Sequence, residues 1–242
     1  MPMKDYVDLH THTIASGHAY NTINEMIGAA ADQALKIYGI TEHAPAMAGS
    51  CTVMYFQNLK VMPRERMGMT VLYGAELNIL DFDGRVDLPQ RTLAQMDLTV
   101  ASMHTPCYRS GTKAENTRAY LNVMKNPYVN IIGHPDDGRF PVDYRALAEG
   151  AKESGVLLEM NNSSLSPHSF RDHSREHYLE MLEYCRLYET PIVLDSDAHV
   201  DLDAANHDLA WQLIKEAGFP EQLVVNTRPE MLQDYLNYYR RQ

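Results

Sequence analysis

The chain of 242 residues is long enough to bury one sizeable core, and 45% of its residues are hydrophobic. Its 21 basic residues against 32 acidic residues give a formal net charge of −11. This balance disfavours nucleic acid or an anionic membrane as the main partner. It is compatible with an anionic substrate, because bound metal ions would be the largest local charges in a site.

Cysteine content and apolar runs indicate the compartment. The three cysteines Cys51, Cys107 and Cys185 are scattered and odd in number, which does not make a disulfide framework. Residues 1–5 lack the apolar segment of a signal peptide, and no run reaches transmembrane length. We therefore expect a cytoplasmic protein with reduced thiols, no membrane partner and a single domain over residues 1–242. The oligomeric state stays open.

The first predicted strand, residues 6–9, leads into the motif Asp8-Leu9-His10-Thr11-His12. His10 and His12 are two residues apart, so on an extended strand their side chains share one face. Two imidazoles that converge from one strand suit a divalent metal ion. A polar pair at the solvent end of a strand is the alternative, and this motif alone leaves it open.

A helix is predicted next. Thr22-Ile23-Asn24-Glu25 is typical of a capping box, and an apolar stripe at helical spacing continues to Leu35, with Gly39 as the expected exit. Further along, residues 77–80 and 85–88 flank a turn at 81–84, which predicts a β-hairpin. Apolar spacing over residues 178–185 and 209–217 predicts two more helices that pack against a core.

Short apolar runs that end in residues of metal-ligand type recur along the whole chain. The residues 10, 43, 76, 104, 134, 161 and 197 follow one another at intervals of 33, 33, 28, 30, 27 and 36. A strand–helix–strand unit needs roughly 30 residues. The predicted strands are residues 6–9, 37–40, 71–75, 98–103, 129–133, 156–158 and 192–194, and a short eighth strand at 223–225 stays open.

Seven strand–helix repeats are compatible with a parallel barrel or an open sheet. In a barrel the carboxyl ends of all strands meet at one face, whereas an open sheet brings only a few together. Polar residues at nearly every strand end favour the α/β barrel, with a site at the C-terminal face of its strands.

The polar set at this face contains seven of the eleven histidines of the chain and two carboxylates. Catalytic zinc takes about three protein ligands, so nine ligands supply about three ions if a carboxylate bridges two of them. Histidine with carboxylate suits Zn²⁺, Mn²⁺ or Fe²⁺ without choosing among them. The nine predicted ligands are His10, His12, His18, His43, Glu76, His104, His134, Asp197 and His199.

From about residue 5 to residue 199, this ligand pattern resembles the PHP (polymerase and histidinol phosphatase) family. The stretches Ser16-Gly17-His18-Ala19-Tyr20 and Asn161-Asn162-Ser163-Ser164 resemble a small stand-alone bacterial phosphatase subgroup. The resemblance implies a distorted (β/α)7 TIM-like barrel that holds a trinuclear metal centre, zinc-like or mixed.

The resemblance also implies how the ligands divide among three divalent ions, with Zn²⁺ as the expected metal. Glu76 would bridge two ions, and Glu76 and Asp197 would be the catalytic carboxylates. The implied sets are His10, His12, Glu76 and Asp197; Glu76, His104 and His134; and His18, His43 and His199.

The expected reaction is hydrolysis of a phosphomonoester of a small metabolite by a metal-activated hydroxide. Asp197 or Asp136 would relay the proton. Arg109 and Arg139 are candidate substrate-binding residues, with a solvated loop arginine as the alternative for each. Asn161 and Glu159 would contact substrate or orient the histidines, or else cap a loop.

Other histidines are expected outside the site. His173 and His177 have helical spacing without the H-E-x-x-H motif, which indicates a solvated helix face, and His168 and His207 are expected at the surface.

Three alternative functions stay open at this point. They are a phosphodiesterase of the 3′-exonuclease type, which the charge of −11 disfavours, a histidinol-phosphate phosphatase, and a metal-binding regulatory module without turnover.

Overall fold

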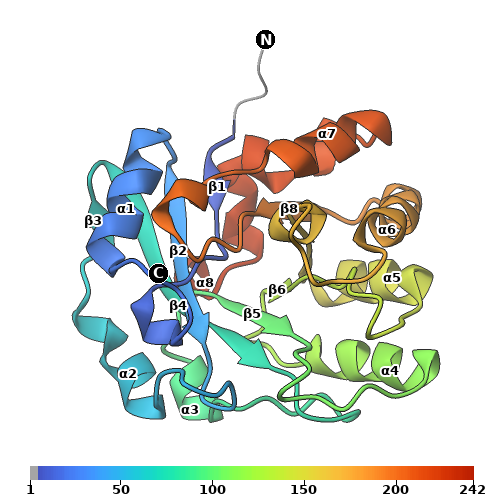
Figure 1. Cartoon of the computed structure of the whole chain (residues 1–242), viewed down its shortest axis with the longest axis horizontal. Helices are drawn as coiled ribbons and strands as arrows, with labels where there is room; N and C mark the ends of the chain where they lie inside the picture. The colour runs from blue at the N-terminus through green and yellow to red at the C-terminus, as the bar shows by residue number, and fades with distance from the viewer. Residues whose placement is uncertain (1–4) are drawn as a thin grey trace.

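The structure, a computed structural model, describes residues 5–242 and has a parallel barrel at its centre (Figure 1). Neighbouring strands follow chain order and pair in parallel. The seven strands are β1 (Val7–Asp8), β2 (Ile37–His43), β4 (Met69–Asn78), β5 (Thr99–Ser102), β6 (Ile131–Ile132), β7 (Leu157–Asn161) and β8 (Ile192–Asp195). The predicted α/β barrel is confirmed.

The first and last strands close the barrel by irregular contacts instead of a regular ladder. Thr11 and Ala198 form a single parallel bridge, and the Leu9 N–H donates to the Asp195 carboxylate at 2.7 Å. The barrel is therefore nearly closed, and its seam lies beside the motif that carries His10 and His12.

Helices surround the strands, with α1, α2 and α3 on one side in Figure 1 and α4, α5 and α6 on the other. Their bounds are α1 (Ile23–Asp32), α2 (Val53–Asn58), α3 (Gln90–Leu93), α4 (Lys113–Val123), α5 (Tyr144–Ser154), α6 (Ser174–Tyr188), α7 (Asp208–Glu216) and α8 (Asn237–Arg240). The capping box at Thr22 and Glu25 is formed, and the helices predicted over 178–185 and 209–217 are confirmed as parts of α6 and α7.

Two local predictions are wrong or only partly right, and the question of an eighth barrel strand, left open above, is answered for the described residues. Helix α1 ends at Asp32, and Gly39 lies inside β2, where an added Cβ would sit 2.5 Å from the Leu9 carbonyl oxygen. The turn at 81–84 forms, but its arms make a single isolated β-bridge, between Ile79 and Val86, and no regular ladder. Residues 223–225 contribute one bridge from Val224 to β8 and no eighth strand.

A short hairpin that the sequence reading missed precedes the third barrel strand. Strand β3 (Glu65–Arg66) pairs antiparallel with the start of β4 across Met67 and Gly68. Both turn residues have positive φ, which fits a tight two-residue turn.

Alternation along the strands explains where the polar residues go. In β4, Leu72 belongs to the apolar cluster inside the barrel, and Glu76, four residues later, lies on the same face. Leu157 and Glu159 in β7 repeat this relation, because side chains of one face recur every two residues. The barrel interior is therefore apolar near the strand starts and polar near the strand ends.

The C-terminal segment closes the apolar end of the barrel. Val225, Leu232 and Leu236 are buried with the interior apolar cluster. Within residues 5–242, none of the helices has the length and apolar character needed to span a membrane. Residues 1–4, on which part of the signal-peptide expectation rests, lie outside the described residues.

Candidate metal centre

Glu76 lies at the centre of the polar end of the barrel. It is fully buried at the end of β4, and five imidazoles surround its carboxylate. The nitrogen–oxygen distances are 2.6 Å from His43, 2.9 Å from His134, 3.1 Å from His104, 3.4 Å from His10 and 3.5 Å from His12.

Asp197 supplies a second carboxylate at the barrel seam. Its Oδ1 lies 3.3 Å from His12 Nε2 and 3.7 Å from both His10 Nε2 and His199 Nδ1. The Asp197 N–H donates to the His10 carbonyl at 2.9 Å, and its φ of 53° is rare for a residue with a side chain. The backbone of the seam therefore turns this carboxylate toward the histidines of β1.

His18 joins the cluster from the loop after β1. The preceding Gly17 has a φ of 83°, and an added Cβ there would meet the Gly49 oxygen at 2.4 Å. This close approach requires glycine and places His18 Nε2 3.2 Å from His43 Nε2. The His18 ring centroid lies 4.9 Å from that of His199. All nine predicted ligands are thus brought together at one end of the barrel.

The hydrogen bonds of three histidines determine which ring nitrogen faces the carboxylates. His10 Nδ1 donates to Glu159 at 2.6 Å, and His104 Nδ1 donates to the Asn78 carbonyl oxygen at 2.8 Å. Ser16 Oγ donates to a buried carboxylate, so it accepts from His12 Nδ1 at 3.0 Å. Each histidine therefore turns its Nε2 toward the carboxylates, and in the neutral ring Nδ1 is the nitrogen that carries the proton.

A ring nitrogen that faces a carboxylate is stabilised by a proton or a metal cation between the two. The Nε2 atoms of His10 and His12 are buried, with no hydrogen-bond partner among residues 5–242. Imidazole and carboxylate donors are those that Zn²⁺, Mn²⁺ and Fe²⁺ take in proteins. The residues present therefore fit divalent metal ions.

The ligand atoms form several compact groups. Three sets have atoms within 4.8 Å of one another: His12, His43 and His199; His10, His12 and Glu76; and His43, Glu76 and His104. These sets overlap with the expected ones, but His12, His43 and Glu76 each belong to two of them. Which residue binds which ion therefore stays a proposal.

The electrostatics of the cluster favour positive charge. Burial alone would raise the pKa of Glu76 and Asp197, but nearby histidines hold both pKa values well below the usual range. Burial would lower the pKa of His10, but Glu159, Glu76 and Asp197 raise it well above its usual value. In His12, burial and its neighbours His43 and His199 lower the pKa. Protons and metal ions therefore compete for the same imidazole nitrogens and carboxylate oxygens.

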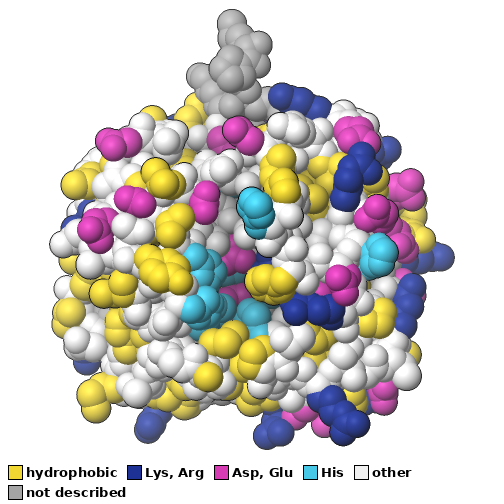
Figure 2. All heavy atoms as spheres, in the orientation of Figure 1, with side chains coloured by type: hydrophobic (Ala, Val, Ile, Leu, Met, Phe, Trp, Pro, Cys, Tyr) yellow, Lys and Arg dark blue, Asp and Glu magenta, His cyan; other side chains and the backbone are white. Residues whose placement is uncertain are grey.

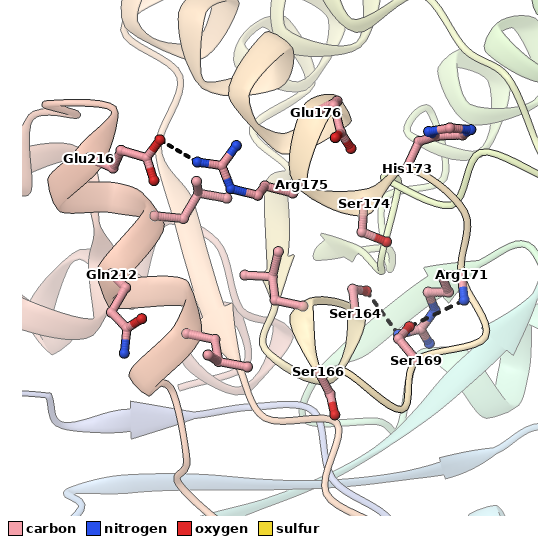
Figure 3. Close-up of a pocket in the computed structure, with 13 residues that line it drawn as sticks. Ser164, Ser166, Ser169, Arg171, His173, Ser174, Arg175, Glu176, Gln212 and Glu216 are labelled. Atoms are coloured by element: carbon pink, nitrogen blue, oxygen red, sulfur yellow. Dashed lines mark hydrogen bonds and ion pairs between the residues drawn. The ribbon is translucent and has the colours of Figure 1, made fainter.

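Arg171 is a site residue that the sequence reading missed. Its guanidinium is 7% exposed and donates to Asp197 at 3.0 Å, to Ser164 at 2.9 Å and to Asn161 at 3.3 Å. Figure 3 shows Arg171 beside Ser164, in the wall of a neighbouring pocket. Arg171 comes from an irregular loop without periodicity, so only its charge could have pointed to it.

Asn161 and Glu159 support the site from β7. The Asn161 amide donates to Glu159 at 3.2 Å and to Asp197 at 3.1 Å, and its oxygen accepts from Ser164 at 3.1 Å. Its polar atoms are therefore used within the protein. This arrangement favours orienting the carboxylates over contacting substrate.

The cluster opens into a cavity of about 660 Å³. In Figure 2, histidines line a hollow in the middle of the face, with carboxylates inside it. Arg139 lines this cavity, whereas Arg109 is exposed and does not. Asp136 is buried behind Ser164 at 3.2 Å and does not line it either.

The exposure of the remaining histidines agrees only in part with the prediction that all of them lie at the surface. His168 is exposed at the cavity rim. The prediction of a surface position is wrong for His207, which is buried with its Nδ1 2.7 Å from Asp5. His173 is exposed, but His177 is half-buried and contacts the Asp136 carbonyl at 2.7 Å.

Comparison with known proteins identifies the family. A family model described as the PHP domain matches residues 8–218. A probable phosphatase of Clostridium novyi is 41% identical over 97% of this chain and 95% of its own length. A probable phosphatase of Caldicellulosiruptor saccharolyticus is 42% identical over the same shares.

A solved structure shares the fold. The histidinol phosphate phosphatase of Lactococcus lactis, crystallised with zinc, L-histidinol and phosphate, is 20% identical and has a TM-score of 0.61. The match covers 89% of this chain and 95% of that one. The family expected from the ligand pattern is confirmed, and this chain belongs to the PHP domain family.

Proposed function

We propose that this protein is a metal-dependent phosphomonoesterase that acts on a small phosphorylated metabolite. It is an enzyme of the phosphatase class, as its near full-length relatives indicate. The observation that carries the finer proposal is the convergence of nine histidine and carboxylate side chains around Glu76. We further propose that residues 1–242 form one domain.

The proposed centre holds three divalent ions, with Zn²⁺ as the expected metal and Mn²⁺ or Fe²⁺ as alternatives. We assign His10, His12, Glu76 and Asp197 to one ion, Glu76, His104 and His134 to a second, and His18, His43 and His199 to the third. Bound divalent ions would lower the pKa of water and offset the charge of the phosphoryl oxygens.

The side chains of the site would hold the positive charge of the bound ions in place. Glu76 and Asp197 are the proposed catalytic carboxylates because each lies close to histidines from more than one segment of the chain. Glu159, Ser16 and Asn78 fix the imidazole orientations by accepting their Nδ1 protons. Burial of the cluster keeps bulk water away and strengthens each of these interactions.

The zinc and L-histidinol in the Lactococcus lactis structure support zinc and a small phosphorylated substrate for this chain. The formal charge of −11 argues against a nucleic acid substrate.

Hydrolysis assays with metal analysis test the proposal. Metal-reconstituted protein is expected to hydrolyse p-nitrophenyl phosphate in preference to bis-p-nitrophenyl phosphate and to lose this activity with a chelator. Preference for the diester would indicate a phosphodiesterase. Tight metal binding without hydrolysis of either ester would indicate a regulatory module. Assaying histidinol phosphate beside other phosphorylated metabolites would then narrow the substrate.

A further inference from the structure

The cavity above the proposed metal centre extends beyond the candidate ligands. Its volume of about 660 Å³ lies in the range of pockets that enclose a whole small molecule. The inference below rests on the proposed function and concerns the part of the substrate that leaves with the ester oxygen. The wall around that part includes Met47, Thr105, Pro106, Arg139, Phe170 and Asp203.

Two arginines line this cavity, and they differ in how exposed their side chains are. The Arg171 guanidinium donates to Asp197, Ser164 and Asn161 and is nearly buried. Arg139 comes from the loop after β6, and its side chain is 29% exposed. Arg139 is therefore the arginine that a substrate can reach.

Asp137 fixes one edge of the Arg139 guanidinium. Arg139 Nε lies 2.9 Å and 3.0 Å from the two Asp137 oxygens, and Nη2 lies 2.5 Å from Oδ2. The Asp137 side chain is 3% exposed, so this pair is held firmly. Nη1 of Arg139 donates to no residue among 5–242, which leaves the edge between Nη1 and Nη2 open. That edge is a two-pronged donor suited to a carboxylate or a phosphate.

Phe170 supports the guanidinium from the loop before α6. Its ring is 72% exposed, and the Arg139 guanidinium carbon lies 4.9 Å from the ring centroid. Such stacking restricts the guanidinium plane and keeps its remaining edge oriented. The exposure of both groups places them at the mouth of the cavity, whereas Glu76 and Asp197 are buried.

We propose that Arg139, held by Asp137 and Phe170, binds an anionic group on the leaving-group portion of the substrate. The enzyme then selects phosphomonoesters that carry a second negative charge away from the transferred phosphate. The opposite selection would come from Asp203, an exposed carboxylate at the same rim, which would favour a cationic leaving group.

Three aryl phosphates that differ in one substituent test this selection. Phenyl phosphate, 4-carboxyphenyl phosphate and 4-(aminomethyl)phenyl phosphate are assayed with metal-reconstituted wild type, Arg139→Met and Arg139→Lys. We expect Arg139→Met to lower kcat/KM for the carboxylated substrate about tenfold more than for phenyl phosphate, mainly through KM. Comparing ratios between variants cancels the intrinsic reactivity of each ester.

Arg139→Lys keeps an ion pair with Asp137 but removes the two-pronged edge, so an intermediate loss is expected. Arg118→Met is the matched control, because Arg118 also stacks on a phenylalanine, at 5.9 Å from Phe82, but lies outside the cavity. For each of the three substrates, kcat/KM of Arg118→Met should equal that of the wild type.

Two results would overturn the inference while leaving the proposed function standing. Equal losses on the carboxylated substrate and on phenyl phosphate would place Arg139 at the transferred phosphate. If the wild type prefers the aminomethyl substrate and Arg139→Met keeps this preference, the cavity rim selects cationic leaving groups instead. Failure of the wild type to hydrolyse any of the three esters would instead overturn the proposed function itself.

Discussion

At the scale of single residues, the site is a balance between carboxylates and imidazole lone pairs. Glu159, Ser16 and Asn78 accept the outer protons of three histidines, so the inner nitrogens face Glu76 and Asp197 and can bind a metal ion when the rings are neutral. With neutral rings, this arrangement places buried acceptors opposite one another, which is unfavourable in a purely structural cluster. It is favourable where cations occupy the centre.

Arg171 is a positioning residue in this balance, because it contacts Asp197 and no reacting atom. Arg171→Met should weaken metal binding and phosphatase activity about 10–100-fold, since groups that orient a metal ligand have effects of this size. Metal titration and kcat/KM check this expectation. Arg175→Met is the control, because Arg175 is an exposed arginine of α6 paired with Glu216.

Arg171→Lys separates positioning from folding. It keeps the charge beside Asp197, so part of the metal affinity should return, whereas a merely structural role would change only the free energy of unfolding. Unchanged metal affinity in Arg171→Met would contradict the positioning role.

At the scale of elements, strand alternation determines which side chains enter the site. The sequence predicts this part well, because apolar runs with a polar residue at the end are a local signal, as at Glu76 and His104. The end of α1 was predicted wrongly because Gly39 was interpreted as a helix exit. Gly39 instead lets the backbones of β1 and β2 approach closely, and no local sequence pattern reveals that contact.

Gly39→Ala should lower the free energy of unfolding by about 2–3 kcal/mol, because its Cβ would overlap the Leu9 carbonyl oxygen at 2.5 Å. Urea unfolding measures the change. Gly28→Ala in α1 is the control: nothing lies within 4 Å of an added Cβ there, so stability should rise by up to about 1 kcal/mol. Equal effects of the two substitutions would refute the close-approach argument.

At the scale of the whole molecule, contacts between segments far apart in the sequence hold the fold together. The sequence alone predicts few of these contacts. Asp5 accepts from Trp211 of α7 at 2.8 Å and from Asn226 at 3.2 Å, and it pairs with His207. His207 was expected at the surface because its partner lies 202 residues away. The position of Arg171 was missed for the same reason, since irregular loops and long-range pairs have no periodicity.

The His207–Asp5 pair predicts a pH dependence of stability. Burial would lower the pKa of His207, but Asp5 and Asp8 raise it well above 6.5. Because the folded pKa exceeds the unfolded one, this stabilisation is complete below about pH 6.5 and is lost as the pH rises through the folded pKa. His207→Gln should therefore cost about 3 kcal/mol near pH 6 and less at higher pH.

Urea unfolding of wild type and His207→Gln at several pH values checks this trend. A difference in unfolding free energy that stays constant from about pH 6 to about pH 10 would show that the charge of His207 does not stabilise the fold.

The central claim is that Glu76 joins the candidate ligands into one catalytic metal centre. Its most direct test is the metal content and phosphomonoesterase activity of wild type and Glu76→Gln after identical reconstitution. We predict about three divalent ions per wild-type chain, and loss of both bound metal and activity in the variant. A Glu76→Gln protein that retains the full metal content and activity of the wild type would contradict the account.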